Sequence, residues 1–350
     1  MGMVAWALSE LRYSIAAASV ISFIFTYVTT PWFNKFFIAT GIVGKDIMKR
    51  ESEPVADMGG PEVILGLLTG VFFYIGMGIF LFGEVPGLTY ILASISTTLI
   101  ITLIGVFDVL TTLMKAKEGK GIFERMKRKG IPRWFYYFIP IPAAIPLSAV
   151  KAGIPTMILP FLGEVEFGLV YPLVLIPLAV LCCSNATNFY AGFNGLEAGM
   201  GFVLHLSLGV YAYVNGRYAA SLIALTFAFA LLAFLRYNWY PAKVFPGDLN
   251  YTIGAVCVCV AVIGNMERFA ILCFLPWVVE AILKAFSGFE AENFGVLQED
   301  GTLEPREKGV YSLTHVVMRA GRFREYQVSA ILILVEVLVC GVSYVLVQYI

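Results

Sequence analysis

The sequence predicts an all-α integral membrane protein with about ten transmembrane helices. Of its 350 residues, 59% are hydrophobic and only 14% are charged, and the mean hydropathy is +0.82. Soluble domains carry roughly 25% charged residues, so a chain of this composition is expected to lie in a bilayer. Its apolar residues also gather in runs of about 20, which is the length that a helix needs to cross the hydrocarbon core.

Ten apolar runs are predicted to cross the membrane, and together they form one polytopic domain over residues 1–350. They are residues 11–32, 62–83, 88–107, 134–152, 168–187, 197–214, 218–236, 249–266, 268–287 and 327–349. The first run has no small-residue cleavage site after it, so a retained span is expected and not a signal peptide. The longest hydrophilic piece, 288–325, is expected to form a loop appendage between the last two spans, with a hairpin turn at residues 297–303.

The basic residues are distributed very unevenly between the two sets of loops. The loops after spans 1, 3, 5, 7 and 9 hold 20 of the 24 Lys and Arg residues. Because Lys and Arg are concentrated in cytoplasmic loops, these loops are expected to be cytoplasmic, and ten crossings would put both termini on the other side. The formal net charge is zero, which argues against a nucleic-acid partner.

One polar stretch, at residues 185–199, lies where the fifth span ends, and it reads N-A-T-N-F-Y-A-G-F-N-G-L-E-A-G. Asn185 and Asn188 are three residues apart and share a face if the helix continues. Gly192 and Gly195 allow the backbone to leave helical geometry and to approach a ligand closely. A polar turn between two spans is the alternative, because loops are rich in Asn and Gly.

Further polar clusters on the side predicted to be cytoplasmic favour a site over a plain turn. They are residues 44–49 with 57–60, Asp108 with Lys115 and Lys117, and residues 238–241 with 245–248. A carboxylate near a membrane boundary usually faces a cavity or a partner, although Asp108 and Asp248, taken singly, could each be an interfacial cap. Together, two carboxylates, paired amides and several lysines suit a divalent cation with phosphates, because magnesium prefers oxygen ligands and lysine adds positive charge.

The histidines and cysteines favour packing roles over zinc or redox chemistry. His205 lies inside the sixth predicted span and is expected to be a core histidine, whereas His315 lies in the basic last loop and could be a surface or a site residue. The six cysteines, at positions 182, 183, 257, 259, 273 and 340, all fall within apolar runs. They are therefore expected to be packing residues and not a disulfide framework.

Two of these stretches resemble the motifs of one enzyme family. Residues 185–199 resemble the N-x-x-N-x-x-x-G-x-N-G-L-E-x-G stretch of the eukaryotic and archaeal UDP-GlcNAc:dolichyl-phosphate GlcNAc-1-phosphate transferases. Residues 237–248, Y-N-W-Y-P-A-K-V-F-P-G-D, resemble the same family's N-W-Y-P-x-x-V-F-x-G-D, and G-K-D-I-M-K at 44–49 resembles its G-x-D-x-x-K. The likeness to these polyprenyl-phosphate N-acetylhexosamine-1-phosphate transferases covers nearly the whole chain.

The resemblance implies a reaction, a cofactor and partners. N-acetylhexosamine 1-phosphate, with GlcNAc-1-phosphate as the first choice, would pass from a UDP-sugar to dolichyl or another polyprenyl phosphate, releasing UMP. This would be the first membrane step of lipid-linked oligosaccharide synthesis for N-glycosylation. The implied cofactor is Mg²⁺, with Mn²⁺ as an alternative, and a homodimer is a further expectation. The site would be formed by cytoplasmic loops, in the plasma membrane of an archaeon or the endoplasmic reticulum of a eukaryote.

The resemblance also assigns roles to individual residues. It implies Asn188 and Asp248 as metal ligands, and Asp108, Lys117 and Asp248 as catalytic residues. In the family, the residue matching Phe245 stacks on uracil and the residue matching Asn194 reads the edge of that base. The substrate-binding residues implied are Lys45, Asp46, Ile47, Lys49, Asn185, Asn194, Glu197 and Phe245. A strong general base is not required, since the lipid phosphate is already anionic.

The chain departs from the family's pattern in two places. The family has an Asp-Asp pair at the end of span 3, whereas this chain reads Phe107-Asp108. The family's last loop begins with a His/Arg-rich sugar-phosphate motif, whereas residues 288–295 read G-F-E-A-E-N-F-G. Arg306, His315, Arg319 and Arg322 are the candidates to replace its basic groups, and the identity of the N-acetylhexosamine therefore stays open.

Two other classes of protein explain part of the pattern. A transporter for a nucleotide sugar or another anion would explain the spans and the intramembrane polar groups, but its site is expected near the midplane of the membrane. A catalytically weakened relative that binds lipid phosphate or UDP-sugar as a partner subunit would explain Phe107. Release of UMP would indicate the transferase, movement of substrate across the membrane the transporter, and binding alone the weakened relative.

Overall fold

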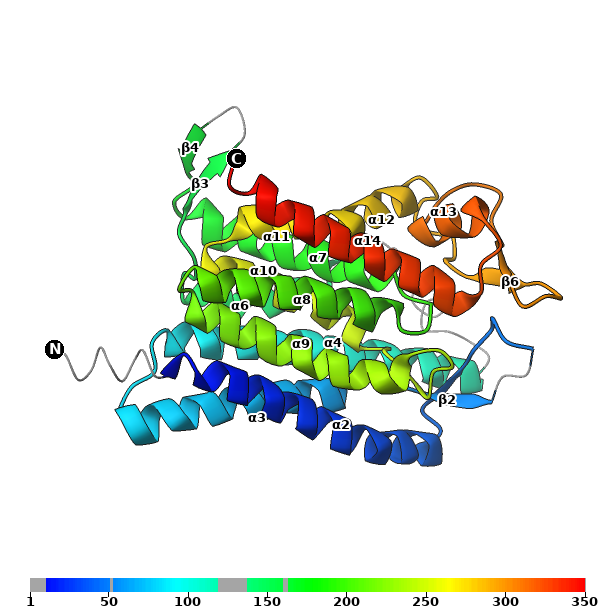
Figure 1. The fold of residues 1–350 in the computed structure, drawn as a ribbon, viewed down its shortest axis with the longest axis horizontal. Coiled ribbons are helices and arrows are strands. Elements are labelled where there is room, and N and C mark those ends of the chain that lie inside the picture. The colour runs from blue at the N-terminus through cyan, green and yellow to red at the C-terminus, as the bar shows by residue number, and fades with distance from the viewer. Residues whose placement is uncertain (1–10, 51–52, 119–136, 160–162, 350) are drawn as a thin grey trace.

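The helices lie side by side in a bundle, and α2 begins and α14 ends at the same end of it (Figure 1). This is a computed structural model, which describes residues 11–50, 53–118, 137–159 and 163–349. The helices of the first half are α2 (Ser14–Thr40), α3 (Gly60–Met77), which the π-helix η1 (Gly78–Phe82) continues, α4 (Leu88–Glu118), the 3₁₀ helix η3 (Ile141–Ala144) and α6 (Ile145–Ala149). Those of the second half are the π-helix η4 (Tyr171–Leu175), α7 (Ile176–Phe189), α8 (Leu196–Val214), α9 (Tyr218–Asn238), α10 (Leu249–Gly264), α11 (Glu267–Cys273), α12 (Leu275–Ala285), α13 (Leu313–Ala320) and α14 (Glu325–Leu346).

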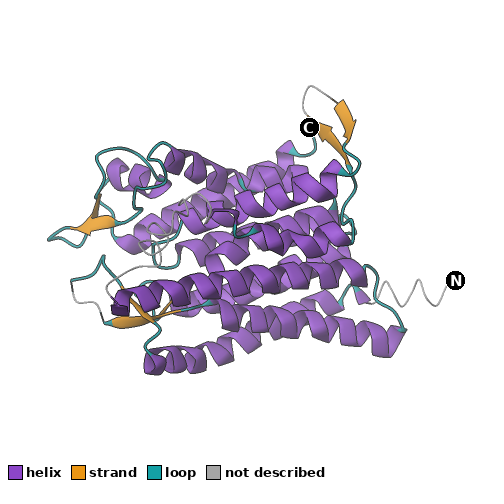
Figure 2. Ribbon diagram, turned by 180° about the vertical axis from the view of Figure 1, so that it is seen from behind, coloured by secondary structure: helices purple, strands orange, loops and turns teal. Residues whose placement is uncertain are grey.

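The strands are short and lie at the two ends of the bundle, outside the helices (Figure 2). One sheet has the order β1 (Val43–Lys45), β2 (Pro54–Asp57) and β5 (Val244–Phe245). Two hairpins are formed by β3 (Thr156–Leu159) with β4 (Gly163–Glu166), and by β6 (Gly295–Leu297) with β7 (Leu303–Pro305). The second hairpin pairs Leu297 with Leu303, so the turn expected at 297–303 is confirmed.

Six helical segments in the described part of the chain are long and apolar enough to cross a membrane. They are Ser14–Thr40, Gly60–Phe82, Leu88–Thr111, Tyr171–Phe189, Tyr218–Asn238 and Glu325–Leu346. The chain is thus a helical membrane protein, as predicted, but the expectation of ten such helices is not met. The expected span 249–266 is a helix of only 16 residues, and the expected span 268–287 is divided into α11 and α12 just before Pro276.

The expected span 134–152 is not one helix in its described part, which begins at residue 137. Three prolines, at positions 140, 142 and 146, interrupt it, and proline both lacks an N–H group and clashes with the preceding turn. The segment still runs along α7 in the opposite direction. Asn185 donates a hydrogen bond to the Tyr137 carbonyl at 2.8 Å, and a Cβ atom on Gly153 would lie 2.6 Å from the Tyr171 hydroxyl.

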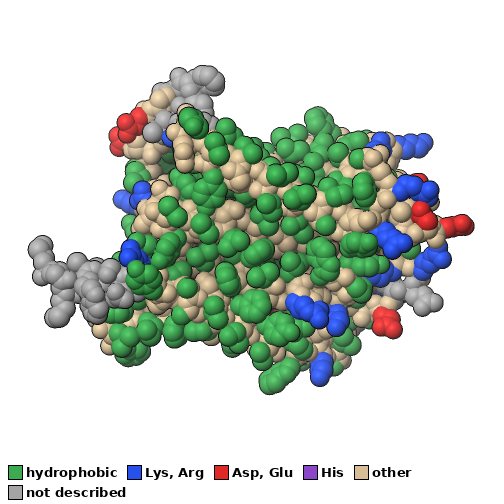
Figure 3. Space-filling view, viewed as in Figure 1, with side chains coloured by type: hydrophobic (Ala, Val, Ile, Leu, Met, Phe, Trp, Pro, Cys, Tyr) green, Lys and Arg blue, Asp and Glu red, His purple; other side chains and the backbone are tan. Residues whose placement is uncertain are grey.

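The surface and the core agree with a bilayer environment. Hydrophobic side chains cover the middle of the face in Figure 3, whereas Lys, Arg, Asp and Glu side chains gather toward the two ends. His205 is fully buried, with Nδ1 2.8 Å from the Gly201 carbonyl and its ring edge-on to Phe227. The expectation of a core histidine is therefore confirmed. The cysteines are free thiols, four of them buried and Cys182 exposed.

Candidate active site

The sheet β1–β2–β5 joins two parts of the chain that are far apart in the sequence. β2 pairs antiparallel with β1 and parallel with β5, and Asp57 lies opposite Phe245. Gly44 lies against both residues: a Cβ atom there would be 3.0 Å from Asp57 Oδ2 and 3.2 Å from the Phe245 ring. The sheet therefore places the first polar cluster directly beside the second family-like motif.

Asn238 joins the two family-like motifs to each other. It is fully buried, its Oδ1 accepts a hydrogen bond from the Gly195 N–H at 3.1 Å, and its Nδ2 donates to the Val244 carbonyl at 2.9 Å. Gly195 has a φ of +78°, which favours glycine, and a Cβ atom there would lie 2.6 Å from Trp239. The first amide of N-W-Y-P is thus a structural bridge, while the glycine beside it permits close packing.

A pocket of about 250 Å³ lies where these segments meet. Six of the residues implied as substrate-binding or site residues line it: Lys45, Asp46, Ile47, Asn194, Glu197 and Phe245. The other lining residues include Asp57, Gly192, Asn250 and Phe294. Residues from the first loop, from both family-like motifs and from the last loop therefore share one cavity.

Asn194 is held on several sides, and this arrangement fixes the wall of the pocket. Its Nδ2 donates to Asp46 Oδ2 at 3.0 Å, and its backbone N–H donates to Glu325 Oε1 at 2.9 Å. Its carbonyl accepts from the Ser329 hydroxyl at 2.9 Å. Lys49 forms an ion pair with the same Asp46 oxygen at 2.6 Å, so Lys49 supports the pocket through Asp46 and is not among its lining residues.

Glu197 closes the glycine-rich turn and is one of the residues that line the pocket. Its Oε1 accepts from the Gly192 N–H at 2.6 Å, whereas its buried Oε2 has no hydrogen-bond partner among the described residues. Gly192 has a φ of +141°, and a Cβ atom there would lie 2.8 Å from Phe294. The turn can therefore approach the last loop closely because this position carries no side chain.

Asp57 is a pocket residue that the sequence did not single out as a site residue. It lies at the end of β2 and lines the pocket, and burial raises the pKa of its carboxyl to about 6. Its only signal in the sequence was its place before the Gly59-Gly60 pair. The pairing of Asp57 with Phe245 depends on the parallel strand contact, which links residues almost 190 positions apart and which no local pattern predicts.

Asp248 is buried just behind the pocket, between the beginning of α3 and one face of α4. Its Oδ1 accepts from the Gly60 N–H at 2.9 Å, and its Oδ2 has no partner among the described residues. A Cβ atom on Gly60 would lie 2.0 Å from that Oδ2, and one on Gly105 would lie 2.5 Å from the Asp248 carbonyl. Burial is the first cause that raises the pKa of Asp248, to about 7, and the charge of Asp57 adds to it.

A second group of polar residues lies beside Asp248, on α4, α7 and α10. Asp108, one turn after Gly105 on α4, is hydrogen-bonded to the Tyr251 hydroxyl on α10. Asn185 on α7 donates to the carbonyls of Tyr137 and Leu181, both at 2.8 Å. Asp108 and Asn185 are therefore brought near the pocket, but neither is among its lining residues.

Asn188 lies within α7, so it shares the Asn185 face as expected. Helices α7 and α10 run in opposite directions and touch where a Cβ atom on Gly254 would lie 2.2 Å from the Cys183 carbonyl. One helical turn from this contact, Asn250 on α10 comes level with Asn188 on α7. The end of α7 therefore meets the start of α10 beside Asp248.

The donor atoms at this place suit a hard divalent cation. Asp248 Oδ2, Glu197 Oε2 and Asn250 Oδ1 are buried oxygens without a hydrogen-bond partner in the described part of the chain. Carboxylate and amide oxygens are the protein ligands that Mg²⁺ and Mn²⁺ take. No group of three or more His, Cys, Asp or Glu side chains able to hold a metal is found among the described residues, so substrate oxygens or water would have to complete the coordination.

The basic candidates of the last loop make other contacts. Arg306 pairs with Glu292 at 2.6 Å, and Arg319 donates to the carbonyls of Glu307, Lys308 and Gly309. His315 is buried, with Nε2 2.8 Å from the Glu292 carbonyl, and burial lowers its pKa. These three residues hold the fold of the appendage, and Arg322 pairs with Asp300 at 2.8 Å. None of the four is among the residues that line the pocket. The side chain of Lys117 lies outside the described part of the structure.

Phe107, which stands where the family has its first acid, faces outward. Its side chain is 59% exposed, whereas the next residue on the helix, Asp108, is bonded to Tyr251. The side chains of neighbouring residues on an α-helix point in directions about 100° apart, so Phe107 and Asp108 lie in different surroundings. The chain thus keeps the acid that faces the helices and lacks the one that faces out.

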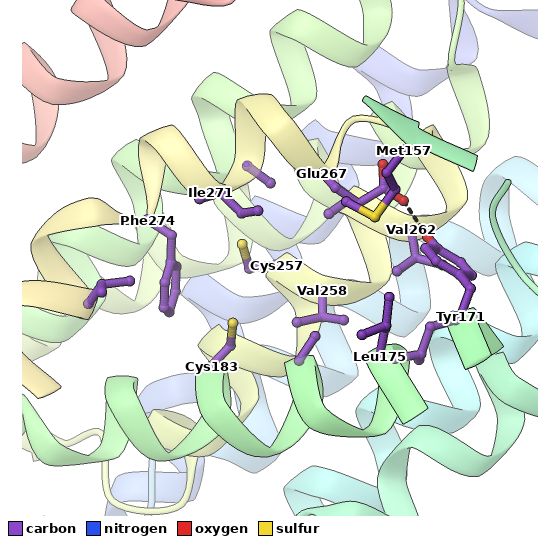
Figure 4. A pocket seen from close by; sticks show the side chains of 15 residues that line it. Met157, Tyr171, Leu175, Cys183, Cys257, Val258, Val262, Glu267, Ile271 and Phe274 are labelled. Carbon is purple, nitrogen blue, oxygen red and sulfur yellow. Dashed lines mark hydrogen bonds between the residues drawn. The ribbon is translucent and has the colours of Figure 1, made fainter. Parts of the chain in front are cut away.

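A second, apolar cavity of about 280 Å³ lies between α7, α10, α11 and α12 (Figure 4). Leu175, Val258, Ile271 and Phe274 are among the residues that line it, and Cys183 and Cys257 lie toward one side. Tyr171 donates a hydrogen bond to Glu267 at its other side. The cavity therefore follows α7 along the membrane toward the asparagines at the end of that helix.

These features define a polytopic helical membrane protein with a polar pocket at one end and an apolar cavity between its helices. Residues 90–265, about half of the chain, match the family described as glycosyl transferase family 4. The chain belongs to this family.

Similar proteins carry names within one group of activities. A protein of Saccharolobus solfataricus, provisionally named a UDP-N-acetylglucosamine–dolichyl-phosphate N-acetylglucosaminephosphotransferase, is 34% identical over 333 residues, which is 93% of this chain and 95% of that protein. The Dictyostelium discoideum protein of the same name is 25% identical over 258 residues, 61% of this chain and 62% of that protein. A phospho-N-acetylmuramoyl-pentapeptide-transferase of Streptococcus pyogenes is 26% identical over 268 residues, 75% of this chain and 76% of that protein.

Proposed function

We propose that the protein transfers GlcNAc-1-phosphate from UDP-GlcNAc to dolichyl or another polyprenyl phosphate and releases UMP. An oxygen of the lipid phosphate attacks the β-phosphorus of the UDP-sugar. The bond from that phosphorus to the oxygen shared with the α-phosphorus breaks, and UMP leaves with this oxygen and its electron pair. The observation that carries the proposal is the single pocket formed by the two family-like motifs and joined by Asn238.

The pocket supplies the contacts that a UDP-sugar needs. Phe245 offers an aromatic face to uracil, and Asn194, fixed by Asp46 and Glu325, offers an amide to the edge of the base. Lys45 supplies positive charge for the phosphates. The cavity of about 250 Å³ is smaller than usual ligand pockets of roughly 300–1,000 Å³, so part of the sugar nucleotide would extend beyond it.

Asp248 and Asn188 are the residues that we propose to hold a Mg²⁺ ion, with Mn²⁺ as the alternative. The unpartnered Oδ2 of Asp248 supports this assignment. When bound, the ion would act as a Lewis acid on the pyrophosphate. The chain's own contribution is to orient both phosphates and to exclude water, which is the main source of catalysis in phosphoryl transfer.

The apolar cavity of Figure 4 is proposed to receive the hydrocarbon chain of the lipid substrate. Its walls are almost entirely apolar, and it follows α7 toward Asn185 and Asn188. A lipid lying there would bring its phosphate to the side of Asp108 and Tyr251. Asp108, oriented by Tyr251, would then help to position that phosphate.

We further propose that the pocket faces the cytoplasm and that the chain passes the membrane ten times. The distribution of basic residues supports this orientation, because 20 of the 24 Lys and Arg residues would be on the pocket side. In this arrangement the six long spans would make six of the ten passes. The other four would be made by α8, α10, the pair α11–α12 and the proline-broken segment from residue 137 to 153.

The decisive test is UMP release by the purified protein in detergent. It is given dolichyl phosphate, Mg²⁺ and either UDP-GlcNAc or UDP-GalNAc. Release that requires both the lipid and the metal is the expected result, and the faster sugar identifies the substrate. No release with either sugar, from protein that still binds UDP-GlcNAc, would replace the transferase proposal with that of a binding partner.

Phe245→Ala is expected to raise the KM for UDP-GlcNAc about tenfold with a smaller change in kcat. The expectation follows from the loss of aromatic stacking on a base, which contributes about 1–3 kcal/mol. Steady-state UMP release at varied UDP-GlcNAc measures it. Phe286→Ala, which removes a ring that is 75% exposed, is the matched control, and an unchanged KM in Phe245→Ala would contradict stacking.

The value of kcat/KM is expected to rise with pH between about 6 and 8 and then to level off. Burial raises the pKa of Asp248 to about 7 and that of the neighbouring Asp57 to about 6, and the proposed metal-binding role requires Asp248 to be charged. A raised pKa means that the charged form of Asp248 is gained only as the pH passes through about 7. Higher Mg²⁺ should move this rise to lower pH, because the cation and the proton compete for one carboxylate. A flat profile at limiting Mg²⁺ would contradict the metal-binding role of Asp248.

A further inference from the structure

A cavity of about 540 Å³ lies at the far end of the bundle from the proposed transferase site. Arg12, Tyr90, Arg217, Tyr218 and Ile263 are among the residues that line it. Helix α9 begins at this cavity with Tyr218 and ends with Asn238, the residue that joins the two motifs of the active-site pocket. A helix of 21 residues is about 30 Å long, so this cavity is separate from the active-site pocket. The proposed transfer reaction therefore does not use it.

The described residues that line the cavity carry positive charge. They include Arg12 and Arg217 and no carboxylate. Arg12 is hydrogen-bonded to the hydroxyls of Tyr13 and Tyr218, and its buried Nε has no partner in the described part of the chain. No described carboxylate forms an ion pair with either arginine.

Three helices begin at or beside this cavity, whereas α8 and α10 end there. α2 begins at Ser14, just after Arg12; α4 begins at Leu88, just after Gly87, which lines the cavity; and α9 begins at Tyr218. The first turn of a helix carries unpaired N–H groups and about half a positive charge. The positive charge of the cavity therefore comes mainly from the two guanidinium groups, and an anion would relieve the repulsion between them.

The remaining wall of the cavity is apolar. Leu11, Tyr74 and Ala220 are buried lining residues, and Ile263 joins them from the end of α10. The cavity lies where the apolar helices α4 and α9 begin, and the headgroup layer of a bilayer is expected at the ends of such helices. An anion attached to an apolar body therefore matches the site better than a fully hydrated one.

We propose that this cavity binds a phosphate group, supplied by the headgroup of an anionic membrane phospholipid. Arg12 and Arg217 donate hydrogen bonds to the phosphate oxygens, as planar guanidinium groups do well. Tyr90 and Tyr218 offer hydroxyl groups, and the apolar wall receives the glycerol backbone and the beginning of the acyl chains. A free phosphate ion offers the same oxygens to the arginines, so the experiment includes it as a separate probe.

The test compares lipid retention by the purified full-length protein and by the double variant Arg12→Gln/Arg217→Gln, using native mass spectrometry. The probes are dioleoylphosphatidylglycerol, dioleoylphosphatidylcholine and inorganic phosphate, each added to delipidated protein, with the thermal midpoint followed in parallel. The unsubstituted protein is expected to prefer the anionic lipid. Each lost arginine should weaken this binding about tenfold, since a hydrogen bond to a charged group is the contact removed.

Two further variants separate binding from folding and from unspecific attraction. Arg217→Lys keeps the charge and should retain most of the binding. Arg322→Gln removes an exposed arginine in the last loop, where it pairs with Asp300 at 2.8 Å, and should bind the lipid as the unsubstituted protein does. UMP release by the double variant should stay within about twofold, because the transferase pocket is distant.

Each outcome decides the proposal. Loss of phosphatidylglycerol binding in the double variant alone supports the lipid site. A response to inorganic phosphate that the double variant lacks, without any preference for phosphatidylglycerol, keeps the phosphate site but overturns the lipid as its occupant. Equal binding of all probes by the unsubstituted protein and the double variant overturns the site itself.

Discussion

Asp248→Asn is expected to lower the rate of UMP release about 100-fold or more while the protein stays folded. The amide can still accept the Gly60 N–H bond through Oδ1, which preserves the observed contact of 2.9 Å. Its NH₂ group, however, takes the place of the unpartnered Oδ2 and can neither bind a cation nor carry charge. Loss of one preorganised electrostatic contact costs about 10²–10³ in rate. Turnover of the purified variant at saturating substrates measures the effect.

Two controls make the result on Asp248 specific. Asp300→Asn removes a carboxylate in the exposed β6–β7 turn, where it accepts from Thr302, and should leave the rate unchanged. The thermal midpoint of Asp248→Asn should lie close to that of the unsubstituted protein. Near-normal turnover in Asp248→Asn would contradict the metal assignment and would leave Asn188 without its proposed partner.

Asn238→Ala is expected to lower the free energy of unfolding by about 2 kcal/mol or more and to raise the KM for UDP-GlcNAc. The substitution leaves the Gly195 N–H and the Val244 carbonyl without their partner in a fully buried place. A buried group that loses its hydrogen bond costs about 1–3 kcal/mol. The two motifs that form the pocket would no longer be joined, so substrate affinity should fall together with stability. Thermal unfolding in detergent and steady-state kinetics measure the two effects.

Asn215→Ala is the matched control for this bridge. Asn215 is exposed at the end of α8, and its side-chain amide donates to the Tyr211 carbonyl at 2.8 Å. Its loss should change stability by less than about 0.5 kcal/mol, as at other surface positions. An equal loss in Asn215→Ala and Asn238→Ala, or an unchanged KM in Asn238→Ala, would count against a joining role.

The helical membrane fold could be predicted because it depends on composition. A span such as Tyr218–Asn238 is apolar over its whole length, and the bilayer leaves few structures other than a helix for it. The irregular spans could not be predicted in detail. Hydropathy averages over a window, so it detects that residues 134–152 are apolar but not that Pro140, Pro142 and Pro146 divide them.

The site could be predicted in part because its motifs are compact. Asn194 and Glu197 belong to one turn, and Gly192 beside them was expected to let the backbone approach a ligand. In the structure Gly192 lines the pocket and lies close to the Phe294 ring. The small sheet was missed because its strands have only two to four residues and because β2 and β5 lie far apart in the sequence. Asp57 was missed as a site residue for the same reason.

Charge alone was a poor guide to the residues of the last loop. Arg306, His315 and Arg319 were reasonable candidates by type, but each satisfies carbonyls or a carboxylate of the appendage itself. A sequence does not reveal whether a basic side chain already has a local partner. The distinction depends on the β6–β7 hairpin and α13, which place Glu292 beside Arg306 and His315.

The contacts of α14 bear on how the protein is made. Glu325 and Ser329, in the first two turns of this last helix, hold the backbone of Asn194 on both sides. The ribosome has therefore synthesised both family-like motifs long before the groups that fix Asn194 exist. A nascent chain stalled before residue 325 would carry all the described lining residues of the pocket but lack these two anchors. Nucleotide-sugar affinity should accordingly be gained late in biogenesis, when the final helix has entered the membrane.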